Sequence, residues 1–288
     1  MRYAKGHGTG NDFVVLPDPL DQLDLDAAMV RALCDRRTGI GGDGVLRIAG
    51  IAGDSVGAAP VGPRWFMDYR NADGSVAEMC GNGIRVVARY LLDHGFAAGP
   101  QVAIATRAGV RQVRLEDDGL LTVDMGPVTR SGTSWAVIGG VRQEGLALNV
   151  GNPHLACLVD RPVAAFDLSR TPDVDRAMFP AGVNVEVIRV TGHHEAEMRV
   201  HERGSGASLS CGTGAVAAAV AAAAAAGEWP DRVAGQNDGP GAWTVRVPGG
   251  TLTVIPDALA SLLTGPAVIV AEGEISSGWL AQARQPVA

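Results

Sequence analysis

Hydrophobic and polar residues alternate with a period of two along much of the chain, which is typical of strands that bury one face. Strand-like segments fall at residues 65–70, 101–108, 110–115, 120–125, 184–190, 197–201, 243–247 and 251–255. Turn residues separate these segments, and Pro248-Gly249-Gly250 predicts a β-hairpin between the last two. We therefore expect mostly antiparallel strands joined by short turns.

Two apolar runs, at residues 86–92 and 217–226, interrupt this pattern and predict helices. Each run follows the same phrase, Cys80-Gly81-Asn82-Gly83 in the first case and Cys211-Gly212-Thr213-Gly214 in the second. The duplication predicts an α/β (α+β) fold of two similar, pseudo-symmetric domains. In each domain, mostly antiparallel strands surround a central helix that begins at a cysteine.

The domain border is expected near Gly126-Pro127, and a length of 288 residues suits two domains. The first domain then spans residues 1–126 and carries Cys80, and the second spans 127–270 and carries Cys211. A final strand at residues 267–270 is expected to cross back, so that residues 271–288 join the first domain.

Composition excludes several classes of function. The net charge of −7 and the absence of basic clusters argue against a nucleic-acid partner. The apolar run at residues 217–226 is too short to span a bilayer, and no stretch resembles a signal peptide, so we expect a cytoplasmic protein with no membrane partner. Lys5 is the only lysine, which argues against a pyridoxal phosphate enzyme, and the P-loop tripeptide is absent. We expect no cofactor.

The four cysteines form no disulfide framework and are expected to be thiols. Cys34 and Cys157 lie in apolar stretches and are expected to be buried structural residues. Cys80 and Cys211 differ because each stands at a predicted helix start, where free N–H groups favour a thiolate and can bind a carboxylate. Two such thiols facing one anion pocket could invert a carbon centre, one removing a proton and the other delivering a proton to the opposite face. Racemisation is the simplest reaction of this kind.

Several phrases occur in an order that is highly specific when they are taken together. They are GTGNDF at 8–13, GIGGDG at 39–44, NADGS at 71–75, EMCGNG at 78–83, GNPH at 151–154, VNV at 183–185, ERG at 202–204 and CGTG at 211–214. On these motifs the chain resembles the diaminopimelate epimerases over nearly its whole length. These enzymes interconvert LL- and meso-diaminopimelate without pyridoxal phosphate.

The resemblance implies a role for each matching residue. Cys80 and Cys211 correspond to the family's two catalytic thiols, assisted by His154 and Glu202. The implied substrate ligands are Asn11, Asn71, Asn152, Asn184 and Arg203, together with the helix-start residues Gly81, Asn82, Gly212 and Thr213 for the α-carboxylate. The guanidinium of Arg203 suits a distal carboxylate by its bidentate geometry. The family fold places the active site in a cleft between two α/β domains, and a homodimer is expected by the same analogy.

One position departs from the family, since Ala207 stands where a glutamate is usual. Loss of a carboxylate there is expected to affect the loop before Cys211 and not the fold. Two alternatives stay open at this point. One is a related cofactor-independent racemase or isomerase of the same fold, of the proline or hydroxyproline type. The other is a zinc site formed by Cys80, Cys211 and His154, although the close-spaced cysteine pairs typical of such sites are missing.

Overall fold

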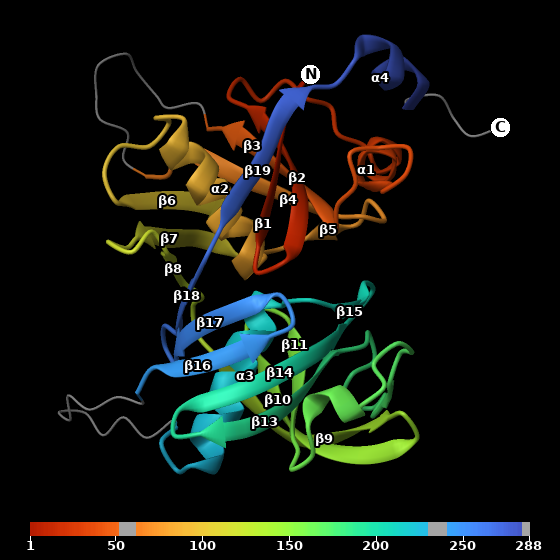
Figure 1. The fold of residues 1–288 in the computed structure, drawn as a ribbon, viewed down its shortest axis with the longest axis vertical. Coiled ribbons are helices and arrows are strands. Elements are labelled where there is room, and N and C mark those ends of the chain that lie inside the picture. Colours follow the sequence, from red (N-terminus) through yellow and green to blue (C-terminus); the bar gives the residue numbers. More distant parts are fainter. Residues whose placement is uncertain (52–61, 230–240, 284–288) are drawn as a thin grey trace. The chain divides into compact units, whose positions relative to one another are not determined.

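The structure, a computed structural model, describes residues 1–51, 62–229 and 241–283. The chain divides into two compact units, residues 1–121 with 266–288 and residues 122–265. For comparison, the sequence places this border near residues 126–127 and the returning segment at 271–288. Both units combine strands with few helices (Figure 1), so the mixed α/β fold class predicted from the sequence is confirmed.

Unit 1 consists of one sheet, a long helix packed on it and two shorter helices. Its strands are β1 (Arg2–Gly8), β2 (Asn11–Asp18), β3 (Gly44–Gly50), β4 (Trp65–Asn71), β5 (Val76–Ala77), β6 (Gln101–Thr106), β7 (Gly109–Leu115) and β19 (Val268–Glu274). Its helices are α1 (Ala27–Cys34), α2 (Gly81–Asp93) and α4 (Ser277–Ala283). The strands pair in the order β19–β1–β2–β3–β4–β6–β7, with β5 added to β4. Helix α2 packs on these strands and buries most of its residues.

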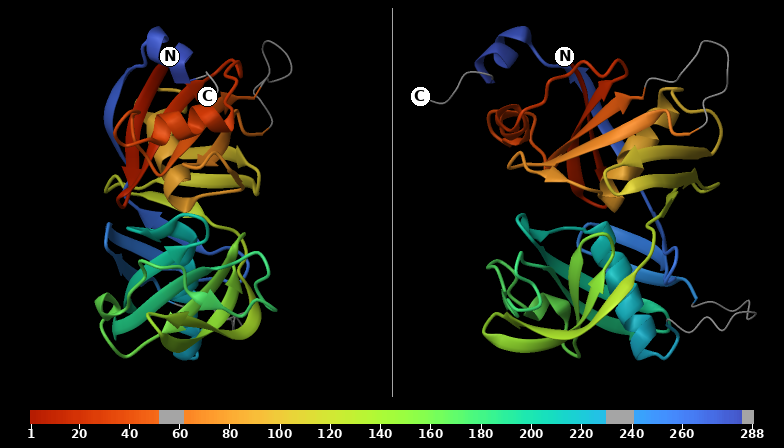
Figure 2. Two further views of the ribbon diagram at one scale, coloured as in Figure 1. Left: turned by 90° about the vertical axis from the view of Figure 1, so that its right-hand side faces the viewer. Right: turned by 180° about the vertical axis from the view of Figure 1, so that it is seen from behind.

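Unit 2 repeats this plan. Its strands are β8 (Leu121–Asp124), β9 (Thr129–Ile138), β10 (Val141–Asn149), β11 (Pro153–Leu158), β12 (Asp173–Val174), β13 (Asn184–Gly192), β14 (Glu195–Glu202), β15 (Gly206–Ser208), β16 (Trp243–Val247), β17 (Gly250–Ile255) and β18 (Leu262–Gly265). A 3₁₀ turn, η1 (Val163–Ala165), and helix α3 (Gly212–Ala225) complete it. The order is β9–β10–β11–β13–β14–β16–β17–β18, with β15 added to β14. Helix α3, coloured cyan, lies along these strands (Figure 2).

The strand directions show that the two units are a structural repeat. In unit 1, β2–β3 and β4–β6 are parallel and the neighbouring pairs are antiparallel. In unit 2, the equivalent pairs β11–β13 and β14–β16 are parallel. A parallel pair needs a crossover connection, and α2 and α3 supply the crossovers of β4–β6 and β14–β16. Alternation along single strands does not reveal these parallel pairs, so the sequence predicts only the antiparallel majority.

Helix α3 is built almost entirely from small residues. Ala217, Ala218 and Ala219 are fully buried, and Ala has the highest helix propensity. Small side chains let the helix backbone approach the strands closely, which explains why a run of alanines can occupy the centre of unit 2. None of the helices that the structure describes is long and apolar enough to cross a membrane.

Candidate active site

Cys80 is the N-cap residue of α2. Its backbone is extended, with φ −143° and ψ 119°, and its Sγ accepts a hydrogen bond from the N–H of Gly83 at 3.3 Å. This sulfur takes the place of the side-chain oxygen that usually caps a helix, and it lies at the positive end of the helix dipole. Such a position favours the thiolate over the thiol.

A chain of side-chain hydrogen bonds connects Cys80 with a buried arginine. Nη2 of Arg85 donates to Oδ1 of Asn82 at 2.8 Å, and Nδ2 of Asn82 donates to Oδ1 of Asn11 at 3.3 Å. Nδ2 of Asn11 then donates to Oδ2 of Asp43 at 2.8 Å. Because a guanidinium only donates and a carboxylate only accepts, both amide orientations are determined. The Asn11 oxygen therefore faces Cys80 and accepts a hydrogen bond from its Sγ at 3.8 Å, a contact that the thiol form makes.

Charged residues hold the Asp43 end of this chain. Nη2 of Arg36 contacts both Asp43 and Asp12 at 2.7 Å, and the Asp43 backbone N–H donates to the carbonyl of Asp12 at 2.7 Å. Lys5 pairs with Asp12 and also donates to the carbonyl of Gly41. Burial alone would raise the pKa of Asp12, but the hydrogen bonds from Arg36 and Lys5 lower it well below the ordinary range. Asp12 is thus a structural carboxylate that helps to hold Asn11 in place.

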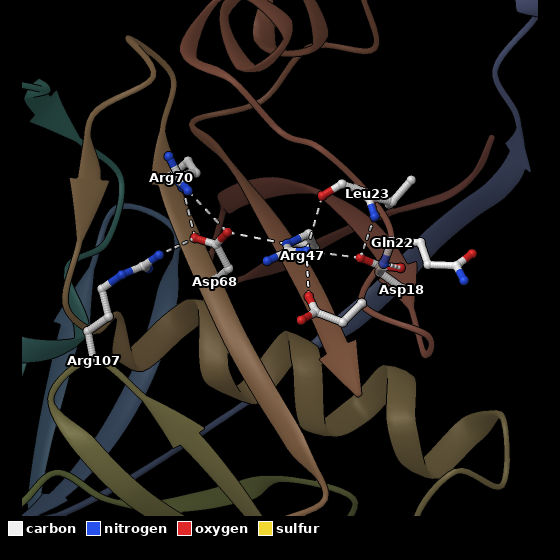
Figure 3. A network of polar contacts seen from close by, with 8 residues as sticks. Asp18, Gln22, Leu23, Arg47, Asp68, Arg70 and Arg107 are labelled. Atoms are coloured by element: carbon white, nitrogen blue, oxygen red, sulfur yellow. Dashed lines mark hydrogen bonds and ion pairs between the residues drawn. The ribbon is translucent and has the colours of Figure 1, made fainter. Parts of the chain in front are cut away.

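Asn71 lies apart from this chain. It ends β4, and its Nδ2 donates to Oγ of Ser75 across a turn at 3.0 Å. Nearby on β4, the buried carboxylate of Asp68 accepts hydrogen bonds from three arginines of unit 1, as Figure 3 shows: Arg47, Arg70 and Arg107. Burial would raise the pKa of Asp68, but these arginines lower it. The network ties β3, β4 and the segment after β6 together close to Asn71.

Cys211 is the N-cap residue of α3 and matches Cys80 closely. Its φ and ψ are −124° and 119°, and its Sγ accepts from the N–H of Gly214 at 3.3 Å. Oγ1 of Thr213 lies 3.4 Å from the sulfur. Cys211 is buried, and burial raises the pKa of its thiol, with further raising from the negative charge of Glu202. These effects favour the protonated thiol.

His154 and Asn152 lie together in unit 2. The ring of His154 is fully buried, and its Nε2 lies 2.8 Å from Oδ1 of Asn152. Its Nδ1 lies 2.7 Å from Oε1 of Glu186. In the parallel pair β11–β13, His154 stands beside Asn184, another residue singled out by the sequence.

Asn184 and Arg203 are also linked. Oδ1 of Asn184 accepts from the backbone N–H of Arg203 at 2.8 Å, directly after Glu202 at the end of β14. Arg203 is exposed and lines a cavity of about 640 Å³ in unit 2, together with His201 and Arg176. Among the residues that the structure describes, no other predicted site residue lines this cavity.

Ala207 lies on β15, where it pairs with His201 of β14. Its side chain is exposed. An exposed alanine leaves the strand pairing intact, so an effect confined to the loop before Cys211 stays our prediction for this position.

Three residues that hydrogen-bond to predicted site residues are missing from the set predicted from the sequence: Arg85, Asp43 and Glu186. Asp43 stands inside a motif quoted for the resemblance, GIGGDG at 39–44. Arg85 lies two residues after EMCGNG, and a basic residue beside an apolar helical run is a signal that could have found it. Glu186 stands between valines in a strand whose five consecutive residues Asn184–Ile188 are all buried. The alternation of hydrophobic and polar residues therefore does not indicate a functional carboxyl group at this position.

The zinc alternative lacks a free ligand atom at His154, because both ring nitrogens already contact Glu186 and Asn152. A different group could hold a metal ion, since ligand atoms of His193, His194 and Glu228 lie within 4.8 Å of one another. That group is at the β13–β14 turn and beyond the C-terminal end of α3, whereas Cys211 is at the N-terminal end.

Comparison with known proteins gives one consistent family. The family model described as diaminopimelate epimerase matches residues 3–131 and 146–270. The diaminopimelate epimerase of Thermobifida fusca is 54% identical over 281 residues, covering 96% of this chain and 98% of that protein. The diaminopimelate epimerase of Mycobacterium ulcerans is 47% identical over 294 residues, covering 97% and 98%.

Solved structures with the same fold are more distant in sequence. A Bacillus anthracis phenazine biosynthesis protein aligns with a TM-score of 0.68 at 16% identity, covering 96% of this chain and 99% of that chain. A hydroxyproline epimerase from Agrobacterium vitis aligns with a TM-score of 0.66 at 15% identity, covering 95% and 91%. At these identities the likeness shows the fold alone.

Proposed function

We propose that this chain, which belongs to the diaminopimelate epimerase family, interconverts LL-2,6-diaminopimelate and meso-diaminopimelate with two thiols and no cofactor. The observation that carries the mechanism is the duplicated cap. In each unit a cysteine sulfur accepts the third N–H of a glycine-rich helix start at 3.3 Å. Helix capping does not require a cysteine at both equivalent positions, whereas two-base inversion at carbon requires two acid/base groups.

The reaction needs one sulfur on each face of the α-carbon. A thiolate removes the α-proton, so the C–H bond breaks, an S–H bond forms and the electron pair stays on the substrate as an enolate-like carbanion. The other thiol then delivers its proton to the opposite face and becomes the thiolate. After one turnover the two sulfurs have exchanged protonation states, and no external acid, base or oxidant is consumed.

The carbanion needs fixed donors in a site with little water. The N–H groups of the helix starts fit this need, because they carry partial positive charge and can hold the α-carboxylate as charge develops on it. We assign this role to the helix-start residues of the two units, which are Gly81, Asn82, Gly212 and Thr213.

The remaining predicted residues divide into two roles. Glu202 and His154 assist proton transfer, and the charge of Glu202 favours the thiol form of Cys211. Recognition of a substrate with two amino-acid ends requires acceptors for an ammonium group and a cation for the distal carboxylate. Arg203, whose side chain is exposed, supplies the cation. The amide ligands in this proposal are Asn11, Asn71, Asn152 and Asn184.

The biological setting follows from the same proposal. Interconversion of these isomers belongs to lysine and peptidoglycan-precursor biosynthesis, and we propose that the protein acts there, in the cytoplasm and as a homodimer. Gel filtration with light scattering tests the dimer, and a monomeric mass for the active enzyme would contradict it.

Substrate choice is tested by incubating the reduced protein with LL-diaminopimelate, L-proline and trans-4-hydroxy-L-proline, and separating the isomers by chiral chromatography. We expect turnover of diaminopimelate alone, and its loss in both C80A and C211A. Turnover of proline or hydroxyproline without diaminopimelate would instead favour the racemases that share the fold. Full activity in either cysteine variant would contradict the two-thiol mechanism.

A further inference from the structure

Glu186 is a buried carboxyl group that the mechanism above does not use. It belongs to β13, its exposed fraction is 0%, and it lies against the first turn of α3. A Cβ placed on Gly214 would stand 3.0 Å from its Oε1. Oε1 lies 2.7 Å from Nδ1 of His154, while Oε2 is buried with no hydrogen-bond partner among the residues that the structure describes.

The other side of the imidazole determines where its hydrogen lies. Nε2 of His154 is 2.8 Å from Oδ1 of Asn152, and a carbonyl oxygen only accepts. Nε2 therefore carries a hydrogen. The contact between Nδ1 and Glu186 then holds one further proton. Either the histidine is an imidazolium facing a carboxylate, or it is neutral and accepts a hydrogen bond from a carboxylic acid.

The unpartnered oxygen distinguishes these two states. A carboxylate shares its charge over both oxygens, so a buried Oε2 without a donor would be a desolvated anionic atom. In the acid, the proton lies on Oε1, and Oε2 is a neutral carbonyl oxygen whose lack of a donor costs much less. Burial also raises the pKa of Glu186, which outweighs the lowering by His154.

We propose that Glu186 is a positioning residue, kept as a neutral carboxylic acid that donates to Nδ1 of His154 and so holds this histidine as the neutral Nε2–H tautomer. His154 then donates to the Asn152 oxygen. The amide N–H groups of Asn152 are left to face a ligand, so Asn152 recognises an acceptor and not an ammonium group.

The charge state of Glu186 also matters for the thiol of unit 2. The titratable groups around Glu186 are His154 and Cys157 from β11, Glu202 at the end of β14 and Cys211 at the start of α3. A carboxylate at Glu186 would oppose formation of the Cys211 thiolate, whereas a neutral acid does not. This kinetic consequence rests on the proposed function, but the protonation state itself does not.

Infrared spectroscopy of the full-length protein tests the protonation state directly. In the difference spectrum between wild type and E186Q at pH ~7, we expect the wild type to show the C=O stretching band of a protonated carboxylic acid. This band should shift in deuterium oxide. The exposed carboxylate of Glu144 supplies a control, because E144Q should remove no such band. A carboxylate band lost in E186Q would overturn the proposal, and would mean either that His154 is an imidazolium or that the Asn152 amide donates to Nε2.

Nitrogen NMR of ¹⁵N-histidine protein, assigned with H154Q, gives a second readout. We expect the neutral Nε2–H tautomer of His154 in wild type and in E186Q, because a glutamine amide can donate to Nδ1 as the acid does. An imidazolium in the wild type would refute the assignment.

The kinetic arm compares E186Q with E186L. E186Q should retain kcat and its pH profile, whereas E186L should lower kcat on the order of tenfold, the loss expected for one orienting hydrogen bond. Equal damage in both variants would overturn the proposal. If E186L does not fold, the two spectroscopic measurements on E186Q still decide. If no substrate is turned over, the proposed function fails while the infrared band still tests Glu186.

Discussion

Replacing Arg85 with methionine tests the hydrogen-bond chain that leads to Cys80. Arg85 has an exposed fraction of 0% and lies one turn into α2. Its acceptors are neutral oxygens: Oδ1 of Asn82 at 2.8 Å, the carbonyl of Gly81 at 3.0 Å and the carbonyl of Pro266 at 3.4 Å. Burial lowers the pKa of the guanidinium to about 10, so it is still charged near neutral pH.

The expected cost follows from these contacts. Methionine keeps most of the apolar stem but removes every donor. The Asn82 oxygen loses its short hydrogen bond from a charged group, worth ~1.5–3 kcal/mol, and the longer contact to Pro266 adds little. The variant also no longer buries a cation, which offsets part of the loss. We expect a net local destabilisation of ~2 kcal/mol.

Hydrogen exchange measures this cost where it occurs. A loss of ~2 kcal/mol makes the amides of α2 exchange about 30-fold faster, if they exchange by local opening. Helix α3 is an internal control, because Val216 occupies the position equivalent to Arg85. Exchange in α3 should not change. Unchanged protection in α2, or equal loss in both helices, would refute the reasoning.

Three further predictions concern stability and thiol reactivity. Asp68→Asn should destabilise unit 1 by ~3–5 kcal/mol, because Arg70 and Arg107 lose their buried carboxylate and Arg47 keeps only Asp18 and Asp21 as carboxylate partners among the residues that the structure describes. Thermal unfolding should detect the loss, and an unchanged midpoint would contradict this. Iodoacetamide should modify Cys80 before Cys34 and Cys157, since burial raises the pKa of both of the latter thiols to about 12, and peptide mass spectrometry gives the order. Because its folded-state pKa is lowered, Asp12 contributes stability above the ordinary carboxyl pKa of ~3.9 and loses it as the pH falls further. Asp12→Asn should therefore flatten the acid limb of the stability curve, and an unchanged limb would refute this role.

The repeat and its two capping cysteines could be predicted from the sequence because their signals are local. A helix start needs only its N-cap residue and the glycines that follow, and both stand together in the chain. The hairpin at Pro248-Gly249-Gly250 likewise depends on adjacent residues, and the turn separates β16 from β17 as expected.

The partners that orient the site residues could not be predicted in this way. Asn11 meets Asp43 through a contact that spans 32 positions, and His154 meets Glu186 across the same sequence separation. These contacts depend on the parallel pairs β2–β3 and β11–β13, which bring residues after a crossover beside residues before it. Alternation along one strand shows which face a residue takes, but not which strand lies next to it.

The two-thiol account is tested most directly by proton NMR of LL-diaminopimelate with reduced enzyme in deuterium oxide. Because the proton delivered to the new face comes from a thiol that has exchanged with solvent, the first meso product should carry deuterium at the inverted α-carbon. The remaining LL substrate should still carry hydrogen, and neither C80A nor C211A should form product. An unchanged substrate spectrum, or meso product that retains its original α-hydrogen, would contradict the account.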